Sequence, residues 1–369
     1  MDIKISKKGY LKKINMENNK EKRKEIRNEM IKKFNPSENG LRDHGIFGLP
    51  FLEAESEIVI VPVPWEATVS YLTGTAKGPE AILNASQQLD LYDPIFPEAW
   101  KIGMAMQEIP PDIFYKNKQV REKTEKYLGL YFDGQVDLVL QEEINNSCRL
   151  IHDIVKDSTL KLLNEGKIVG VVGGDHSVTL GYLEALSEKY KSFGILQIDA
   201  HSDLRKAYEG LEYSHASIFY NALKIKNINH LVQIGVRDFC EDEHILINKE
   251  SNRITVFSDY EIRRSIFEGS TWSKVCDNII KKLPKEVYIS FDIDGLKPYL
   301  CTNTGTPAPG GFTVEELIYL FEKIIASKRK IIGFDLCEVT PEKEGEWNGN
   351  VGARILYKLC ILAAKSSQR

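Results

Sequence analysis

Short, continuous apolar runs alternate with longer amphipathic stretches along most of the chain. The runs are 58–63, 167–172, 193–198, 231–236, 254–257, 287–291 and 331–336. Between them, apolar residues recur at helical spacing in 147–164, 177–189, 273–282 and 313–326. Continuous apolar strands separated by helices are typical of a parallel sheet that is covered on both faces. The pattern therefore predicts a three-layer α/β/α domain with a mainly parallel sheet.

The first 45 residues have a different character. The segment 16–34 is dense in lysine and glutamate and is helix-prone, and Asn35-Pro36 ends it. Its apolar residues at helical spacing are Ile26, Met30, Ile31 and Phe34. One narrow face of this helix can therefore dock on the body or on a neighbouring subunit. We expect a charged helical extension over residues 1–45 and one α/β domain over residues 46–369.

Composition narrows the range of partners and compartments. The net charge of −4 and the pI of about 6.1 give no reason to expect nucleic acid or a membrane surface as a partner. No run approaches the ~18 apolar residues of a membrane span, and the N-terminal residues lack the apolar core of a signal peptide. The six cysteines are scattered without a C-x-x-C pair, which favours reduced thiols. We expect a cytoplasmic protein.

Potential metal ligands stand just after three of the predicted strands. The three clusters are Asp175-His176, Asp199-Ala200-His201-Ser202-Asp203 and Asp292-Ile293-Asp294. In an extended segment, alternate residues point to the same side, so Asp199, His201 and Asp203 can converge on one point. The carboxyl ends of parallel strands meet at one edge of the sheet, where ligands bind. We therefore expect the three clusters to form a single site.

The charge of these clusters indicates metal ions. Four buried carboxylates, those of Asp199, Asp203, Asp292 and Asp294, repel one another and have raised pKa values unless cations neutralise them. Two divalent ions balance four negative charges, with neutral histidine nitrogens as further ligands. An oxygen-rich set with two imidazoles suits manganese or a similar octahedral ion better than structural zinc. Nickel, cobalt and iron remain alternatives.

In chain order, these clusters resemble the signature motifs of the ureohydrolases, the arginase/agmatinase family. Supporting matches are Tyr213-Ser214-His215-Ala216-Ser217, Ile234-Gly235-Val236-Arg237, the loop 305–311 and the segment 335–341. The similarity covers about residues 55 to 365, so the domain 46–369 is expected to be catalytic and arginase-like. The family cleaves small guanidino compounds to urea and an amine or ammonia.

The resemblance implies two metal ions held side by side. One ion is bound by His176, Asp199, Asp203 and Asp292, and the other by Asp199, His201, Asp292 and Asp294, with Asp199 and Asp292 bridging. Asp203 and Asp294 thereby belong to the catalytic residues. A metal-activated water attacks the guanidinium carbon, and the tetrahedral product of that attack expels the amine.

Further roles also follow from the resemblance. His215 matches the histidine that transfers a proton to the leaving amine, and Glu338 matches the glutamate that clasps the guanidinium group. Trp65, Thr68 and Tyr71 stand in the place of a pocket loop and are candidate substrate contacts. The alternative for this loop is ordinary packing. The family also implies a homotrimer or homohexamer.

Two features bear on the substrate. Cys240 stands where arginases place an acid that reads the α-amino group of arginine, and the loop 204–215 looks more like that of agmatinases. Agmatine or guanidine is therefore favoured over arginine, and the chain is also reminiscent of the guanidine hydrolase branch. Formiminoglutamase activity is an alternative, with Arg205 or Lys206 as a basic contact. A non-enzymatic regulator and a mononuclear, histone-deacetylase-like site are the alternatives from other classes.

Overall fold

The computed structural model describes residues 21–38, 45–69 and 71–368. Within these residues, eight strands form one sheet, and every neighbouring pair is parallel. The strands are β1 (Ile58–Val63), β2 (Met104–Met106), β3 (Ile168–Gly173), β4 (Phe193–Ile198), β5 (Ile228–Ile234), β6 (Ile254–Phe257), β7 (Glu286–Asp292) and β8 (Lys330–Cys337). Their order across the sheet is β2-β1-β3-β8-β7-β4-β5-β6. The parallel sheet predicted from the apolar runs is confirmed.

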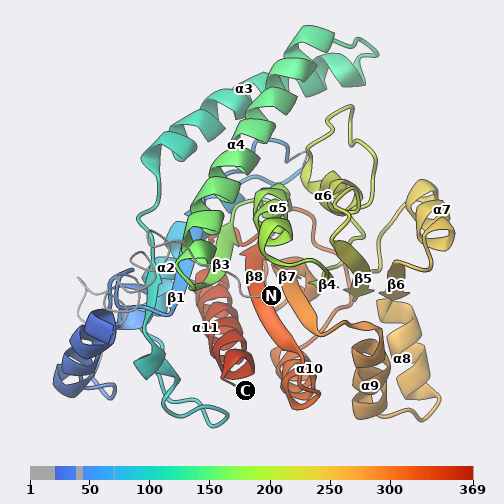
Figure 1. The fold of residues 1–369 in the computed structure, drawn as a ribbon. Coiled ribbons are helices and arrows are strands. Elements are labelled where there is room, and N and C mark those ends of the chain that lie inside the picture. Colours follow the sequence, from blue (N-terminus) through green and yellow to red (C-terminus); the bar gives the residue numbers. More distant parts are fainter. Residues whose placement is uncertain (1–20, 39–44, 70, 369) are drawn as a thin grey trace, which may run out of the picture.

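Helices cover both faces of the sheet (Figure 1). They are α2 (Gly78–Ser86), α3 (Pro111–Phe132), α4 (Leu138–Asn164), α5 (Thr179–Lys189), α6 (Ile218–Ala222), α7 (Glu241–Lys249), α8 (Asp259–Phe267), α9 (Trp272–Lys282), α10 (Val314–Ala326) and α11 (Trp347–Ser367). In β1, Ile58 and Ile60 belong to a core shared with α9, α10 and α11, whereas Val59 and Val61 belong to a second core shared with α4 and α5. Side chains of a strand alternate between faces, so these two cores are the two sides of the sheet. The three-layer α/β/α prediction is confirmed.

Several elements were not predicted from the sequence. The strand β2 has only three residues, too few for a periodic signal. The helix α3 is mostly polar, and α11 is buried along most of its length, so neither shows a clear apolar stripe. The helix α4 begins at Leu138, earlier than the predicted start at residue 147.

The order of the strands brings distant parts of the chain together at the centre of the sheet. After β3 the chain continues into β4, but β8 and β7 lie between these two strands. Gly170 of β3 pairs with Phe334 of β8, and Ile198 of β4 pairs with Phe291 of β7. The carboxyl ends of β3, β8, β7 and β4 therefore meet in a row, at the switch point where α/β sheets bind ligands.

The N-terminal segment packs on the body through its described part. Residues 21–33 are helical, and the predicted residues 16–20 lie outside the described part of the chain. The guanidinium of Arg27 donates to the carbonyl of Ile102 at 2.5 Å and to the carboxylate of Glu57 at 2.7 Å. The ring of Phe34 lies 5.3 Å from that of Trp100. This contact combines an apolar face with a buried arginine, which the apolar spacing alone did not indicate.

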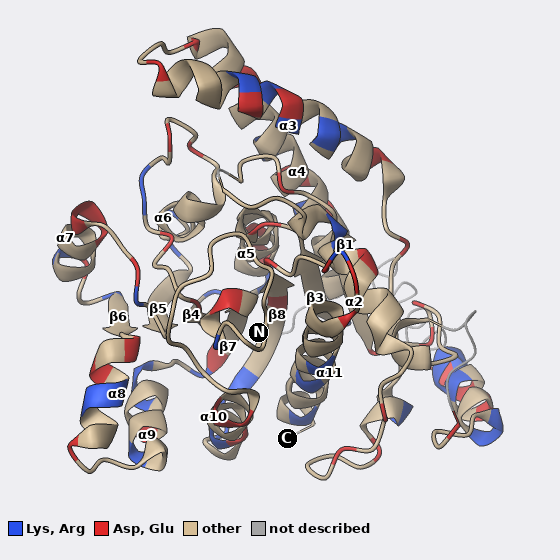
Figure 2. Cartoon of the chain, turned by 180° about the vertical axis from the view of Figure 1, so that it is seen from behind, with Lys and Arg blue, Asp and Glu red and all other residues tan. Residues whose placement is uncertain are grey.

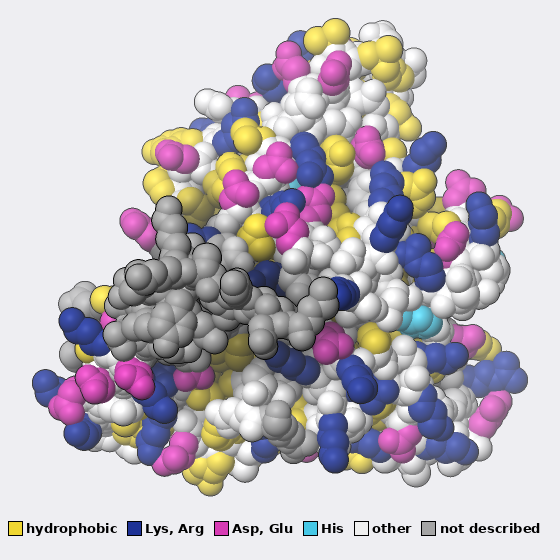
Figure 3. Space-filling model, viewed as in Figure 1, with side chains coloured by type: hydrophobic (Ala, Val, Ile, Leu, Met, Phe, Trp, Pro, Cys, Tyr) yellow, Lys and Arg dark blue, Asp and Glu magenta, His cyan; other side chains and the backbone are white. Residues whose placement is uncertain are grey.

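The helices α3 and α4 form a hairpin that projects from the body in Figure 1. Figure 2 shows basic and acidic positions interspersed along α3. On the face drawn in Figure 3, positive and negative side chains are interspersed. Of the helices in the described residues, none combines the length and the apolar character needed to cross a bilayer.

Alanine substitution of two helical glycines is expected to change the stability in opposite directions. A Cβ on Gly181 of α5 would lie 2.1 Å from the carbonyl oxygen of His152 in α4, whereas one on the exposed Gly129 of α3 would meet nothing within 4 Å. We expect Gly181→Ala to lower the free energy of unfolding by about 1–3 kcal/mol, because the backbones of α4 and α5 must separate. Gly129→Ala is expected to raise it by about 0.5–1 kcal/mol. Thermal unfolding of both variants checks the pair, and equal shifts would contradict the close α4–α5 contact.

Candidate metal and substrate site

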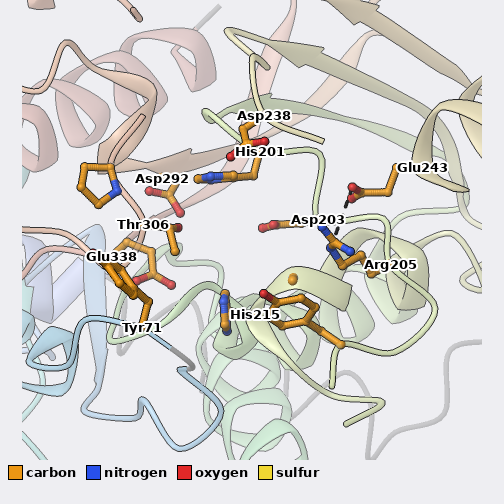
Figure 4. A pocket seen from close by; sticks show the side chains of 13 residues that line it. Tyr71, His201, Asp203, Arg205, His215, Asp238, Glu243, Asp292, Thr306 and Glu338 are labelled. Carbon is orange, nitrogen blue, oxygen red and sulfur yellow. Dashed lines mark ion pairs between the residues drawn. The ribbon is translucent and has the colours of Figure 1, made fainter. Parts of the chain in front are cut away.

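A pocket of about 280 Å³ opens at the carboxyl ends of the central strands. Its lining residues are Tyr71, His201, Asp203, Arg205, Tyr208, His215, Ala216, Asp238, Glu243, Asp292, Thr306, Pro307 and Glu338. Figure 4 shows the carboxylates of Asp203, Asp292 and Glu338 directed toward one central space. The three acids come from different parts of the chain, so the fold itself creates the cluster.

His176 is buried and faces three carboxylates, two of which, those of Asp203 and Asp292, line this pocket. Its Nδ1 lies 3.1 Å from Asp199 Oδ2, 3.2 Å from Asp203 Oδ2 and 3.3 Å from Asp292 Oδ2. Although Nδ1 is buried and surrounded by acceptors, it makes no hydrogen bond. Adjacent ligands of an octahedral ion with bonds near 2.1 Å lie about 3 Å apart. The spacing and the unpartnered nitrogen fit a divalent cation.

A second group shares Asp199 with the first. Nδ1 of His201 lies 3.1 Å from Asp294 Oδ2 and 3.6 Å from Asp199 Oδ1. The two oxygens of Asp199 thus face different histidines, one on each side. Asp199, His201 and Asp294 form one candidate metal-binding group, and His176, Asp199 and Asp292 form another. A shared carboxylate between two ligand groups is the arrangement expected for two neighbouring ions.

A third candidate group, His176, Asp335 and Cys337, lies behind the pocket. His176 Nε2 is 2.9 Å from Ser290 Oγ, which donates to Asp335 Oδ2 at 2.7 Å. The other oxygen of Asp335 accepts from the backbone N–H of Phe291 at 3.1 Å. Because both oxygens of Asp335 are already hydrogen-bonded, this group orients the His176 ring and leaves its Nδ1 directed at the pocket.

Burial and mutual repulsion perturb the acids of the site. Burial, followed by the charges of Asp294 and Asp199, raises the pKa of Asp292 well above its ordinary value. Burial and the charge of Asp199 raise the pKa of Asp203 to about 7. These shifts arise without cations, and they make ionisation of Asp203 and Asp292 unfavourable unless a cation neutralises them. Asp199 differs, because its burial is outweighed by His176 and His201, which lower its pKa. The chemistry of the donors therefore agrees with their geometry in fitting divalent ions.

Glu338 approaches the two candidate metal-binding groups from the end of β8. Its φ of 66° is unusual for a residue with a side chain, and its backbone N–H donates to the carbonyl of Gly174 at 2.8 Å. One carboxylate oxygen accepts from the N–H of His176 at 2.9 Å, whereas Oε2 is buried without a partner. A Cβ on Gly305 would lie 2.8 Å from that oxygen, so the loop leaves space for it. Glu338 therefore offers one unused acceptor to the pocket.

His215 lies on the opposite wall. Its backbone N–H donates to Thr68 Oγ1 at 3.4 Å, and its ring packs edge-on against Tyr208 with centroids 6.0 Å apart. Burial, followed by the positive charge of His201 and His176, lowers the pKa of His215 to about 4. The lowered pKa favours the neutral imidazole, whose ring nitrogen can accept a proton.

The loop that follows β1 divides into packed and pocket-facing residues. Trp65 is fully buried in the core on the α4–α5 side of the sheet, and it does not line the pocket. Thr68 is also buried, and its hydroxyl donates to Asp175 Oδ2 at 3.3 Å. Tyr71 lines the pocket and is 69% exposed, so it stands at the rim. Of the three candidate contacts in this loop, only Tyr71 reaches the cavity.

The outer wall contains residues to which the sequence analysis gave little or no role. Arg205 stacks on Tyr208 at 4.9 Å, and its Nε lies 4.0 Å from the buried carboxylate of Glu243. Asp238 is exposed at the rim. Cys240, in contrast, precedes α7 and is not among the lining residues. Asp238 and Glu243 lack a metal-ligand spacing, and only the fold shows that they reach the pocket.

Comparison with known proteins agrees with this geometry. Residues 56–362 match the arginase family. An N(1)-aminopropylagmatine ureohydrolase of Thermus thermophilus is 32% identical over 82% of this chain and 89% of its own length. An agmatinase of Bacillus anthracis is 28% identical over 78% of this chain and 84% of its own length.

Solved structures of this family share the fold. A proclavaminate amidino hydrolase of Streptomyces clavuligerus superposes with a TM-score of 0.68 at 23% identity, over 89% of this chain and all of the other. An agmatine ureohydrolase of Thermoplasma volcanium gives 0.65 at 22% identity, over 86% and 93% of the two chains. The arginase-like fold is thereby confirmed. With its family match and a relative at 32% identity, the chain belongs to the arginase family and is a ureohydrolase.

Proposed function

We propose that this protein hydrolyses a small guanidino compound to urea and an amine with the help of two divalent metal ions. The observation that carries the proposal is the unpartnered Oε2 of Glu338, buried beside the two histidine–aspartate groups. A buried carboxylate oxygen without a donor is costly, and a planar guanidinium cation supplies donors and charge together. A guanidinium group bound to Glu338 in this way would have its carbon next to the candidate metal-binding groups.

The proposed roles follow the two ligand groups. His176, Asp199, Asp203 and Asp292 hold one ion, and Asp199, His201, Asp292 and Asp294 hold the other. When bound, the ions supply a water nucleophile at neutral pH and neutralise developing charge. Glu338 orients the guanidinium carbon toward that nucleophile, and the neutral His215 takes up a proton and returns it to the leaving amine. The burial of the four aspartates supports this ligand set.

Agmatine is the substrate that we favour. Trp65 and Thr68 are turned away from the pocket and do not shorten it, so about 280 Å³ remain for a guanidino group with an attached chain. Asp238 at the rim adds negative charge where the amine of such a chain would emerge. The names of the relatives, agmatinase and N(1)-aminopropylagmatine ureohydrolase, support the same class. Guanidine itself, which has no chain, leaves most of this space unused.

Formiminoglutamase activity is the second candidate because Arg205 lines the pocket and can meet a carboxylate. A formimidoylglutamase of Bacillus subtilis shares the fold, with a TM-score of 0.62 at 18% identity. The charge of Arg205 is partly compensated by Glu243 and by the ring of Tyr208. This pairing favours agmatine over an acidic substrate.

We also propose manganese as the physiological metal, a cytoplasmic location and a homotrimer or homohexamer. Four aspartate and two histidine ligands suit an octahedral ion. The six cysteines are all free, and five of them are buried, which suits a reducing compartment. We further propose that residues 46–369 form the catalytic domain and residues 1–45 an appended extension, since the family match begins at residue 56.

Urea release tests the proposed function directly. Protein loaded separately with Mn²⁺ and Ni²⁺ is assayed with agmatine, guanidine, L-arginine, guanidinobutyrate and formiminoglutamate, with formamide measured for the last. We expect the highest kcat/KM with agmatine. The value with L-arginine should be at least about tenfold lower, because Cys240 replaces the acid that reads the α-amino group in arginases, and such a charged contact contributes on the order of 1.5–3 kcal/mol. No urea from any guanidino compound with either metal would refute the proposal and favour a non-enzymatic role.

Asp292→Asn tests the bridging ligand. The substitution removes one negative charge from a residue that we propose to bridge both ions, so we expect fewer than two ions per chain and at least about a 100-fold loss of activity. Asp157→Asn, an exposed change on α4, is the matched control. Elemental analysis of both purified variants decides the point. Two retained ions with normal turnover in Asp292→Asn would remove Asp292 from the metal site.

Glu338→Gln tests the guanidinium clasp. Glutamine keeps an acceptor for the N–H of His176 but loses the negative charge, so we expect kcat/KM for agmatine to fall by about 10- to 100-fold with the metal content unchanged. Glu344→Gln, an exposed change in the following loop, serves as the control. Steady-state kinetics and elemental analysis are measured together. An unchanged kcat/KM would show that Glu338 does not bind the guanidinium group.

A further inference from the structure

The two loops that form the outer wall of the pocket are both attached to the α3–α4 hairpin. One loop, residues 204–215, rises from the end of β4 toward the hairpin, and the other, residues 64–74, follows β1 (Figure 1). The first carries Arg205 and Tyr208, and the second carries Tyr71, all of which line the pocket. The hairpin itself contributes no lining residue, so any effect on substrate must pass through these loops.

The loop 204–215 is held by one face of α4. Gln141 Nε2 donates to the carbonyl of Gly210 at 2.6 Å, and Asn145 Oδ1 accepts from the N–H of Glu212 at 2.9 Å. The ring of His152 packs edge-on against Tyr213, with centroids 5.4 Å apart. Gln141, Asn145 and His152 recur at spacings of four and seven, which places them on the same face of the helix. Three consecutive parts of the loop are thus fixed to a single helix.

The tip of this loop fits closely against the hairpin. Glu209 and Gly210 have φ values of 51° and 80°, as the two central residues of a type I′ turn require, and Tyr208 and Leu211 pair across the turn. A Cβ on Gly210 would lie 2.3 Å from the hydroxyl of Tyr127 in α3. Only glycine allows this approach. Because Tyr208 is paired across the same turn, the position of Gly210 determines where the Tyr208 ring stands.

The loop 64–74 is fixed by the other helix. Asn117 of α3 accepts from the N–H of Glu66 at 2.7 Å, and the guanidinium of Arg121 donates to the carbonyl of Val69. Thr68 then joins the two loops, since it accepts from the N–H of His215. Both loops are therefore fixed to the hairpin at their outer ends and to each other near the metal groups.

We infer that the α3–α4 hairpin sets the outer half of the substrate pocket, with Gln141 and Asn145 as positioning residues for the loop 204–215. The metal groups and Glu338 stand on the sheet and do not depend on these contacts. His215, at the end of this loop, is held separately by Thr68. Release of Gly210 and Glu212 should therefore displace Arg205 and Tyr208, which face the chain of the substrate, and leave His215 and the rest of the reacting centre in place. The expected signature is a change in KM with little change in kcat.

The chemistry of the two contacts allows matched variants. Gln141 acts as a donor, so the isosteric change Gln141→Glu removes the bond to the carbonyl of Gly210. Asn145 acts as an acceptor, so Asn145→Asp retains its bond, whereas Asn145→Leu removes it. The control is Glu142→Gln, a carboxylate-to-amide change at the exposed residue next to Gln141. The same amide-to-carboxylate exchange is thus expected to break the contact at Gln141 and to keep it at Asn145. A general loss of stability would not produce this difference between the two positions.

The experiment measures agmatine kinetics, metal content and hydrogen exchange of residues 204–215 for the manganese-loaded full chain. We expect Gln141→Glu and Asn145→Leu to raise KM by on the order of tenfold with kcat within about twofold and to speed exchange in this segment. Asn145→Asp and Glu142→Gln should match the wild type in all three measurements. Wild-type KM and exchange in Gln141→Glu and Asn145→Leu would overturn the inference, as would equal effects of Asn145→Asp and Asn145→Leu.

The kinetic part of this test rests on the proposed function, but the exchange part does not. If the wild type releases no urea from agmatine, the proposed function fails, and exchange in the segment 204–215 still decides whether the hairpin holds the loop. If Gln141→Glu does not fold, the comparison of Asn145→Asp with Asn145→Leu decides it instead. The two hypotheses can therefore fail separately.

Discussion

Electrostatic repulsion among buried carboxylates is the constraint on which the rest of the structure depends. Asp199, Asp203, Asp292 and Asp294 are each at most 6% exposed and lie within one small region. Ionisation of such a cluster is unfavourable unless cations neutralise it, and the cluster must be held by a rigid frame. The frame is the centre of the parallel sheet, where each acid is fixed at or just beyond the end of a strand. Backbone N–H groups add support, as when Ala200 donates to Asp294 at 3.0 Å and His201 donates to Asp199 at 2.7 Å.

The convergence of the inner candidate residues could be predicted from the sequence because it follows directly from the strands. Asp199, His201 and Asp203 end a recognisable apolar run, and parallel strands bring their carboxyl ends to one edge whatever the details of the connections. The ligand clusters therefore had to approach one another once the runs were identified as neighbouring strands. The pairing of β8 with β3 could not be predicted from the sequence, since no local pattern indicates which distant strand lies between two others in a sheet.

The outer half of the site was predicted poorly for the same physical reason. Arg205, Asp238 and Glu243 reach the pocket through loops and a helix start, where the direction of a side chain depends on turns and on distant contacts. Trp65 shows the opposite case, a large aromatic residue in a motif-like loop that the core absorbs completely. The proposed role of the α3–α4 hairpin had no sequence signal, because single amide side chains on a helix look like ordinary surface residues.

The position of β8 has a consequence for the order in which the site is completed during synthesis. This strand follows all the other strands of the described residues in sequence, yet it lies between β3 and β7 and brings Glu338 to the pocket. A ribosome-bound chain that has already formed β3, β4 and β7 carries every proposed metal ligand but has an open slot in the middle of its sheet. Contacts between residues so far apart in sequence form slowly. The strand edges that flank the slot stay exposed until β8 has emerged and paired, and this interval is when a chaperone would protect the chain.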